Sequence, residues 1–351
     1  MIRKYLGITL LFAVCTVIIF LCFYSIASAQ EAPATRPAHI GLFYPVSTNG
    51  TGAAAISNDF SFHVFAGVSR DENAFCLSGL TSIVKGNARG VLISGISGHV
   101  GREASGLQLA GIVNQIKGRA DGLQVAGITN MTGGGNSVQV AGLVNVAQQE
   151  NGVQLSGLLN KAGDVNTQIA GLLNIAKKVK GLQIAGLLNI AEESDYPVGL
   201  INLIKNGEKQ VGVSLDETGS TVIAFRSGGS VLYGIVGAGY NFRYHNARYV
   251  LETGIGAHIP VWQHLRLDLE ISECTLSDIQ NDVYFKSTAG ILAGYKIPGG
   301  IELFAGPTIN QIRFDRSQPD ILHDNYLWSN KGCDNFNGLY IGVKGGINIT
   351  L

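Results

Sequence analysis

The sequence predicts an all-β fold, and three observations support this. Only 14% of the 351 residues are charged, whereas 46% are hydrophobic and 47 are Gly. This composition excludes intrinsic disorder, because the chain has ample apolar surface to bury. A repeat of about 15 residues fills the middle of the chain, and its side chains alternate in character with a period of two, as in β-strands. Alternating segments of the same kind continue through the C-terminal third.

The first 29 residues have the pattern of a secretory signal peptide. Basic residues at positions 3 and 4 precede an apolar run that reaches Ile26, and Ala27-Ser28-Ala29 offers a small-residue cleavage site. We therefore expect residues 1–29 to be removed during secretion across an inner membrane. The alternative is an uncleaved anchor, because the apolar run is long enough to span a bilayer.

Residues 30–73 form a short N-terminal segment that precedes the repeats. Ile40–Ser47 and Phe60–Val68 are expected to be strands, because apolar residues alternate along them. A loop rich in Gly, Asn and Ala joins the two strands. This segment carries no clear copy of the repeat.

The repeat array covers residues 74–217 and is the most specific signal in the chain. Six clear copies share the pattern Gln-x-x-Gly-x-x-Asn, and successive Gln residues lie 16, 15, 15, 14 and 15 positions apart. Degenerate copies flank them at Gly79, Gly95 and Gly199. The polar positions are Gln108, Asn114, Gln124, Asn130, Gln139, Asn145, Gln154, Asn160, Gln168, Asn174, Gln183 and Asn189. The glycines are Gly111, Gly127, Gly142, Gly157, Gly171 and Gly186.

Each repeat predicts one strand of about ten residues with two unlike faces. Around Gly186, one face carries Leu182, Ile184, Leu188 and Ile190, and the other carries Gln183, Ala185, Leu187 and Asn189. The motif is nearly palindromic, so antiparallel pairing would place Gln opposite Asn. Parallel stacking would place Gln on Gln and Asn on Asn as amide ladders. Symmetry alone does not choose between these two pairings.

Two architectures are therefore open. The favoured one is an outer-membrane-type antiparallel β-barrel of about 16–20 strands, built partly from the repeats. Spanning strands need about 9–11 residues, which the repeat supplies, and hairpins tolerate its varying length. The alternative is a β-solenoid with one repeat per coil, followed by a C-terminal β-barrel or β-domain. In either case the Gln and Asn side chains fix the register of the strands or face a lumen.

Residues 218–351 predict strands of the membrane type. Leu265, Leu267, Leu269 and Ile271 alternate with Arg266, Asp268, Glu270 and Ser272, and Pro298-Gly299-Gly300 marks a tight turn. Aromatic residues concentrate in this part, as expected of strand ends at a membrane interface. The last strand, Leu339 to Leu351, resembles a C-terminal signal for the barrel-assembly machinery. Residues 315–337 interrupt the pattern and predict a longer, extracellular loop.

The repeat Gly-Leu-Gln-x-x-Gly-Leu-x-Asn, followed by Gly199-Leu-Ile-Asn-Leu-Ile-Lys-Asn206 and the C-terminal strands, resembles bacterial surface repeat-containing proteins of Gram-negative species. The resemblance covers about residues 74–351. It implies a place in the outer membrane or on the cell surface, with outer-membrane lipid as a partner. It implies no molecular activity.

The sequence offers no motif for catalysis, a cofactor or a metal. It lacks His-Glu-x-x-His, Gly-x-Ser-x-Gly and a phosphate-binding Gly-x-x-x-x-Gly-Lys run. Asp268 and Glu270 share a strand face and permit a weak cation site, although a lumen-facing polar row explains them as well. A net charge of zero argues against binding to nucleic acid. We therefore expect a non-enzymatic protein without cofactors, structural or channel-like, or alternatively a surface-displayed solenoid that binds a ligand the sequence leaves unknown.

Overall fold

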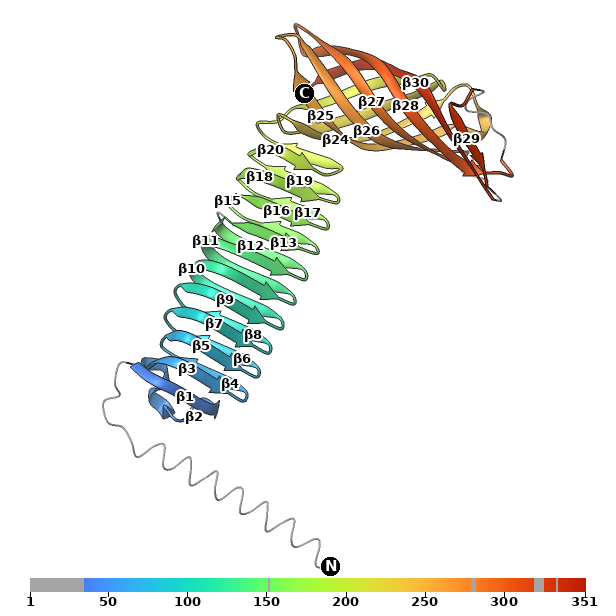
Figure 1. The fold of residues 1–351 in the computed structure, drawn as a ribbon. Helices are drawn as coiled ribbons and strands as arrows, with labels where there is room; N and C mark the ends of the chain where they lie inside the picture. Colours follow the sequence, from blue (N-terminus) through green and yellow to red (C-terminus); the bar gives the residue numbers. More distant parts are fainter. Residues whose placement is uncertain (1–34, 151, 279–281, 319–324, 333) are drawn as a thin grey trace, which may run out of the picture. The chain divides into compact units, whose positions relative to one another are not determined.

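The computed structural model describes residues 35–150, 152–278, 282–318, 325–332 and 334–351. The predicted signal peptide, residues 1–29, lies outside these described residues. The described chain forms a stack of parallel coils and a closed antiparallel barrel (Figure 1). It divides into two compact units, Met1–Asp164 and Val165–Leu351. The predicted all-β fold class is therefore confirmed, with an antiparallel barrel and with the solenoid that was the alternative for the repeats.

The coil stack extends from residue 35 to residue 204 and contains 21 strands and one 3-10 helix among the described residues. Its elements are β1 (Thr35–Phe43), β2 (Val46–Ser47), η1 (Gly50–Ala55), β3 (Ser57–His63), β4 (Ala66–Ser69), β5 (Glu72–Ser78), β6 (Thr81–Val84), β7 (Ala88–Ser94), β8 (Ser97–Val100), β9 (Ala104–Ala110), β10 (Val113–Ala126), β11 (Thr129–Ala141), β12 (Val144–Glu150), β13 (Val153–Ser156), β14 (Leu159–Lys161), β15 (Asp164–Val165), β16 (Thr167–Ala170), β17 (Leu173–Ile175), β18 (Lys178–Ala185), β19 (Leu188–Ala191), β20 (Glu193–Val198) and β21 (Ile201–Ile204).

The repeats pair in parallel and in register. Gln124 lies opposite Gln139, and Asn130 lies opposite Asn145. Each predicted ten-residue strand is in fact two short strands with a bend at the repeat glycine, as in β18 and β19 around Gly186. The antiparallel pairing favoured for the repeats is therefore wrong. The solenoid arrangement holds because stacking places identical side chains and glycines on one another in every coil.

Most of the variation in repeat length is absorbed at one corner of the coil. Between β10 and β11 the register changes from Ile116 opposite Thr132 to Arg119 opposite Gly134, a spacing that shortens from 16 to 15 residues. A similar change between β18 and β20 falls between Val179 and Leu182. Bulges at this polar corner leave the Gln, Gly and Asn positions of the six clear copies in step, which explains why a drifting period is compatible with a solenoid. The last coil differs, because its spacing shortens from 14 residues at Ile184 to 13 at Leu188, across the glycine.

The repeat glycines allow the backbones of successive coils to approach closely. A Cβ atom added at Gly142 would clash with the backbone oxygen of Gly127, and one at Gly157 would clash with that of Gly142. The same relation holds for Gly111 with Gly95, Gly127 with Gly111, and Gly186 with Gly171. Glycine is required here by the lack of space, because a carbonyl group of the preceding coil occupies the place of the side chain.

We expect the substitution Gly142→Ala to destabilise the coil stack by about 3 kcal/mol, since two hydrogen-bonded backbones must move apart. Urea unfolding of the full chain in detergent, monitored through the protease resistance of the coils, measures this change in the free energy of unfolding. Gly52→Ala is the control, because its Cβ would meet only Ile56 Cδ1, at 3.8 Å. Equal stability of the two variants would contradict the steric explanation.

The first coils belong to the same stack as the repeats. β3 pairs in parallel with β5, and β4 pairs in parallel with β6. β1 pairs in parallel with β3 and covers the N-terminal end, while β2 folds back on β1 in antiparallel fashion. The two predicted N-terminal strands thus lie in the solenoid. Each of them is divided in two, the first into β1 and β2 and the second into β3 and β4.

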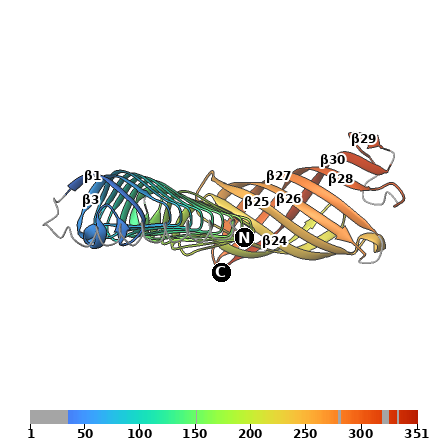
Figure 2. The ribbon, with the colours of Figure 1, turned by 90° about the horizontal axis from the view of Figure 1, so that it is seen from below.

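The barrel extends from residue 209 to residue 350 (Figures 1 and 2). Its elements are β22 (Lys209–Asp216), β23 (Ser220–Gly228), β24 (Leu232–Asn241), η2 (His245–Ala247), β25 (Tyr249–Pro260), β26 (Leu265–Ser277), β27 (Val283–Ile297), β28 (Ile301–Asp315), β29 (Trp328–Lys331) and β30 (Asn335–Thr350). Consecutive strands pair as antiparallel neighbours, and β30 pairs with both β28 and β22, which closes the barrel. β29 pairs only with β30, outside the ring of eight.

The barrel has eight strands, fewer than the 16–20 that the sequence predicts. The predicted number includes the repeats, which form coils instead of barrel strands. It begins at Lys209, before the residue at which the sequence predicts the C-terminal segment. The predicted loop 315–337 contains β29, and residues 319–324 and 333 lie outside the described chain. Neither 3-10 helix among the described residues is long or apolar enough to cross a bilayer.

The two ends of the barrel differ in their connections. At one end, residues 229–231, 261–264 and 298–300 join the strands, and this end also holds the start of β22 and the end of β30. We call it the short-turn end. The described residues among 217–219, 242–248, 278–282 and 316–334 lie at the other end. There, β28, β29 and β30 extend beyond the other barrel strands (Figures 1 and 2).

Candidate functional site: amide ladders and the charged barrel interior

The Asn residues of the repeats form a buried hydrogen-bond ladder inside the coils. Asn114 donates from Nδ2 to Oδ1 of Asn130 at 3.0 Å, and Asn130 donates in the same way to Asn145 at 3.0 Å. The same amide group of Asn130 also donates to the backbone oxygen of Val140, in the next coil, at 2.9 Å. Each Asn therefore joins its own coil to the following one through both side chain and backbone.

The Gln residues form a second ladder that runs in the opposite direction. Gln154 donates from Nε2 to Oε1 of Gln139 at 2.8 Å, and Gln183 donates to Gln168 at 3.1 Å. Beyond Gln183 the ladder has no further amide, because the next position is Pro197. All twelve predicted amide residues are buried within the coils, so none of them faces the lumen of the barrel.

The first coils replace the amides with a cluster of titratable groups. His63 Nε2 lies 3.1 Å from His39 Nδ1, and the other ring nitrogen of His63 lies 3.1 Å from the Ser78 hydroxyl. Nearby, the Ser61 hydroxyl donates to Glu72 Oε1 at 2.8 Å. Burial raises the pKa of Glu72 to about 7 and lowers the pKa of both histidines to about 4. The cluster therefore favours the uncharged form of each group.

These shifts predict how the stability of the first coils depends on pH. Because the folded pKa of Glu72 is raised, its contribution is fully present below pH 4.5 and is lost as the pH rises towards 7. The histidines act in the opposite direction, since their lowered pKa removes stability as the pH falls from 6.5 to 4. We expect Glu72→Gln to stabilise the first coils relative to the natural chain, by an amount that grows from pH 4.5 to 7.

Amide hydrogen exchange of β5 across this pH range measures the difference between the two proteins. Glu103→Gln is the control, because Glu103 is exposed on the coil surface. A difference for Glu72→Gln that does not change with pH would contradict a buried acid that loses its proton in this range.

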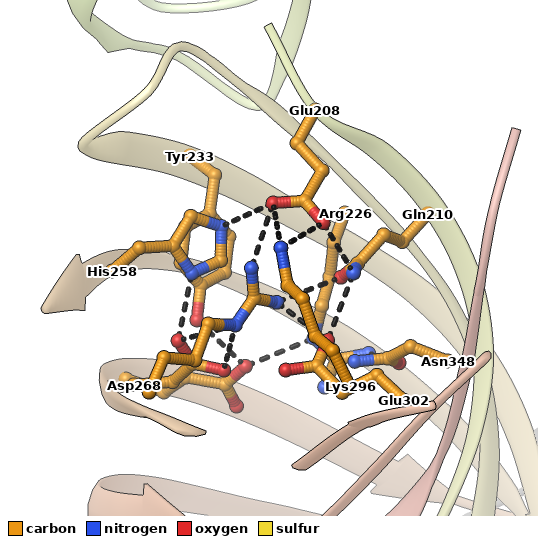
Figure 3. A network of polar contacts seen from close by, with 11 residues as sticks. Glu208, Gln210, Arg226, Tyr233, His258, Asp268, Lys296, Glu302 and Asn348 are labelled. Carbon is orange, nitrogen blue, oxygen red and sulfur yellow. Dashed lines mark hydrogen bonds and ion pairs between the residues drawn. The ribbon is translucent and has the colours of Figure 1, made fainter. Parts of the chain in front are cut away.

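The barrel interior near the short-turn end is a network of charged side chains centred on Arg266 (Figure 3). Its guanidinium group lies 2.7 Å from Glu208 Oε2 and 2.6 Å from Glu302 Oε2, and its Nε lies 3.2 Å from Asp268. Asp268 also contacts His258 Nδ1 at 2.7 Å. The side chain of Arg266 is therefore surrounded by carboxylates, which pair its charge and fix its position.

A second group of charges lies deeper in the barrel. Arg226 Nε lies 2.9 Å from Glu270 Oε1, while Lys344 Nζ lies 3.2 Å from Glu270 Oε2 and 2.6 Å from Glu252. Tyr233 donates its hydroxyl to Glu270 at 3.1 Å and stacks on the ring of His258, with centroids 4.2 Å apart. Glu270 thus joins two cations from β23 and β30, the strands on either side of β22, across the lumen from β26.

Towards the other end, the interior is closed by apolar and aromatic side chains. Tyr284, Phe314, Phe336 and Tyr340 pack in one cluster, with ring centroids of Phe314 and Phe336 4.8 Å apart. Between this cluster and the charged groups lies a cavity of about 10 Å³, enough for roughly one water molecule. Apart from a pocket of about 180 Å³ beside His258 and Arg266 at the short-turn end, the lumen is filled by its own side chains, as expected of an eight-stranded barrel.

The cation site that the sequence permits at Asp268 and Glu270 has other partners. Asp268 pairs with Arg266 and His258, and Glu270 pairs with Arg226 and Lys344. Among the described residues, no cluster of three or more His, Cys, Asp or Glu side chains is arranged to hold a metal ion. The lumen-facing polar row is therefore the arrangement that the structure contains.

The sequence interpretation missed several of these interior charges, namely Arg226, Lys286, Lys344, Glu208 and Glu302. A local signal for them exists. Lys286 stands between Phe285 and Ser287, and Lys344 follows the outward-facing Val343. A single charge placed within a period-two apolar strand indicates a side chain that points into a lumen.

No protein-family model matches this chain, and the comparisons with curated proteins and with solved structures find no match either.

Proposed function

We propose that the protein is a non-enzymatic outer-membrane protein in which the barrel is a closed anchor and the coil stack is the part that the anchor holds. The observation that carries this proposal is the reversed polarity of the barrel. Val213, Ile223, Leu251, Ile271, Ile291, Ile309 and Ile341 point outward and are 46–64% exposed, whereas charged side chains fill the interior. A barrel with an apolar outer surface and a polar interior is suited to lipid, not to water.

The packed lumen favours a structural role over a channel. Conduction requires a continuous water-filled path, whereas the described lumen holds paired charges, a cluster of aromatic rings and a cavity of about 10 Å³. Lys286 and Asp216 form an ion pair beside that cavity, and their side chains fill more of the lumen. We therefore assign the barrel to anchoring, with outer-membrane lipid as its surroundings and the barrel-assembly machinery as its partner during biogenesis.

The chain topology favours a periplasmic place for the coil stack. Only residues 205–208 separate β21 from β22, so the last coil must lie near the short-turn end of the barrel. In outer-membrane barrels, short turns face the periplasm and longer loops face the outside. This rule assigns the coils to the inner side of the membrane, in contrast to the surface display that the sequence suggests as an alternative.

Fractionation without detergent and gel migration before and after heating test the anchor. We expect the mature protein to stay with the membrane, to migrate faster when unheated, and to give no discrete conductance steps in a planar bilayer. A folded product that is soluble in water would overturn the anchor. Discrete conductance from a membrane-inserted barrel would instead favour the channel.

A further inference from the structure

The coil stack carries a continuous row of exposed aliphatic side chains along one corner. The row consists of the residue after each repeat glycine: Ile112, Ile128, Leu143, Leu158, Leu172 and Leu187. These side chains are 38–48% exposed. Backbone hydrogen bonds join successive members, such as Leu143 N to Ile128 O at 3.1 Å and Leu158 N to Leu143 O at 3.0 Å. We call this row the aliphatic ridge.

Charged side chains avoid the ridge and gather at the opposite corner. The segments 107–115, 123–131, 138–146, 153–161, 168–175 and 182–190, which contain the ridge, hold one charged residue, Lys161. Lys117, Arg119, Asp121, Lys178 and Glu193 lie at the corner where successive coils are joined. We call this corner the charged edge. Each coil is thus amphipathic across its width, apolar at one corner and charged at the other.

The coils are also unusual in what they bury. Their interior holds hydrogen-bonded Gln and Asn side chains together with buried aliphatic ones such as Ile116 and Val179, while the Ile and Leu side chains of the ridge lie on the outside. In water this arrangement exposes apolar surface that a soluble solenoid would turn inward. In lipid it is favourable, because backbone and amide groups are for the most part already paired within the stack, the side-chain oxygens of Gln108 and Gln183 being exceptions.

Within the unit Val165–Leu351, the last coil lies against the outside of the barrel wall. At the charged edge, Asp195 accepts a hydrogen bond from the Ser230 hydroxyl at 2.7 Å, in the short turn between β23 and β24. We call the corner that holds the repeat glycine and the ridge the glycine corner. There, the backbone oxygens of Gly199 and Leu200 lie against Gly234 of the barrel. The charged edge therefore lies level with the short turns, and the glycine corner lies further along the barrel strands.

The same corner faces the middle of the lipid-facing wall. A groove of about 510 Å³ is lined by Gly186 and Leu200 from the coils and by Ile255 and Ile271 from the barrel. Ile255 and Ile271 point outward near the middle of β25 and β26. If the barrel spans the membrane, the ridge of this coil lies at the depth of the acyl chains, and its charged edge lies at the level of the headgroups.

We propose that the part of the aliphatic ridge that belongs to the unit Val165–Leu351, formed by Leu172 and Leu187, inserts into the inner leaflet of the membrane that holds the barrel. The occupant of the ridge is the acyl-chain layer of a bilayer, argued from its continuity with the lipid-facing wall and from the separation of charge across each coil. This inference rests on the proposed anchor function. It adds that these coils are themselves a lipid-binding element.

The test uses the full chain in proteoliposomes, with an environment-sensitive fluorophore on single cysteines and quenching by lipids that carry a nitroxide on the acyl chain. Cys333→Ser removes the loop thiol, and Cys76 and Cys274 are buried. The ridge probe is Leu172→Cys, with Leu187→Cys as a second position should the first fail to fold. Lys177→Cys on the charged edge and Ile291→Cys on the barrel wall are the matched controls, all within the unit Val165–Leu351.

We expect quenching at Leu172→Cys to approach that at Ile291→Cys and to exceed that at Lys177→Cys by at least threefold. Quenching at the barrel wall with none at either ridge position would overturn the ridge proposal while leaving the anchor intact. A blue-shifted but unquenched ridge probe would also overturn it, and would indicate a protein partner or a second copy. Absence of quenching at Ile291→Cys would overturn the anchor itself.

Discussion

Replacing Glu270 with Ala is expected to destabilise the barrel by about 3–5 kcal/mol, the cost of leaving a buried cation without its partner. Glu270 is 4% exposed and pairs with both Arg226 and Lys344. Lys344 retains Glu252 in the variant, whereas Arg226 loses its ion pair. Urea unfolding in detergent micelles, monitored by gel migration without heating, gives the free energy of unfolding.

Glu273→Ala is the matched control on the opposite face of the same strand. Glu273 pairs with Arg313 at 3.6 Å on the outside of the barrel, where both side chains are more than a third exposed. We expect its loss to change the free energy of unfolding by less than about 1 kcal/mol. Equal effects of the two substitutions would contradict a lumen held together by paired charges.

Replacing Asn145 with Leu is expected to lower the stability of the coils by about 2–4 kcal/mol, since buried groups in both neighbouring coils lose hydrogen bonds. Asn130 loses its acceptor on Asn145, and Asn160 loses a donor at 2.9 Å. The backbone oxygen of Leu155 loses a donor at 2.7 Å. Hydrogen exchange of β11 and β13 in the full chain measures the loss.

Gln148→Ala is the control for the ladder, because Gln148 has the same kind of side chain but is exposed at the coil surface. Its effect should stay within about 0.5 kcal/mol. Faster exchange confined to the coils next to position 145 is expected, because each coil contacts mainly its neighbours. Unchanged exchange in Asn145→Leu would show that the ladder contributes little to stability.

Much of the fold can be predicted from the sequence. The period of two, the position of Gln and Asn on a common face, and the amide ladders of a parallel stack all follow from the repeat. The choice of parallel pairing does not, because the motif is nearly palindromic about its glycine. That choice depends on the close approach of Gly142 to the Gly127 backbone oxygen, a contact that exists only in the stacked coils.

The bend at each repeat glycine is the second feature that the sequence interpretation missed. A continuous strand through Gly186 would place Leu187 on the same face as Gln183 and Asn189. In the structure the chain turns at Gly186, so Leu187 is 48% exposed while both amides are buried. The aliphatic ridge therefore becomes visible only when the corner is known.

In the barrel, alternation predicted the strands and the lumen-facing row of β26 correctly. The partners of that row could not be predicted, because Arg226, Lys344 and Glu302 come from strands far away in sequence. Their pairing with Glu270 and Arg266 depends on the pairing of β22 with β30, which joins the first and last strands and closes the barrel. Local patterns indicate that a charge points inward, whereas only the closed ring determines which charge it meets.

The most direct test of the account is the sidedness of the two parts in intact Gram-negative cells, measured with a membrane-impermeant maleimide. In a Cys333→Ser background, Lys331→Cys reports the loop end of the barrel and Lys117→Cys reports the coils, since both positions are exposed. We expect Lys331→Cys to be labelled in intact cells and Lys117→Cys only after the outer membrane is permeabilised. Labelling of Lys117→Cys in intact cells, or of neither position before permeabilisation, would contradict an outer-membrane anchor that holds its coils on the periplasmic side.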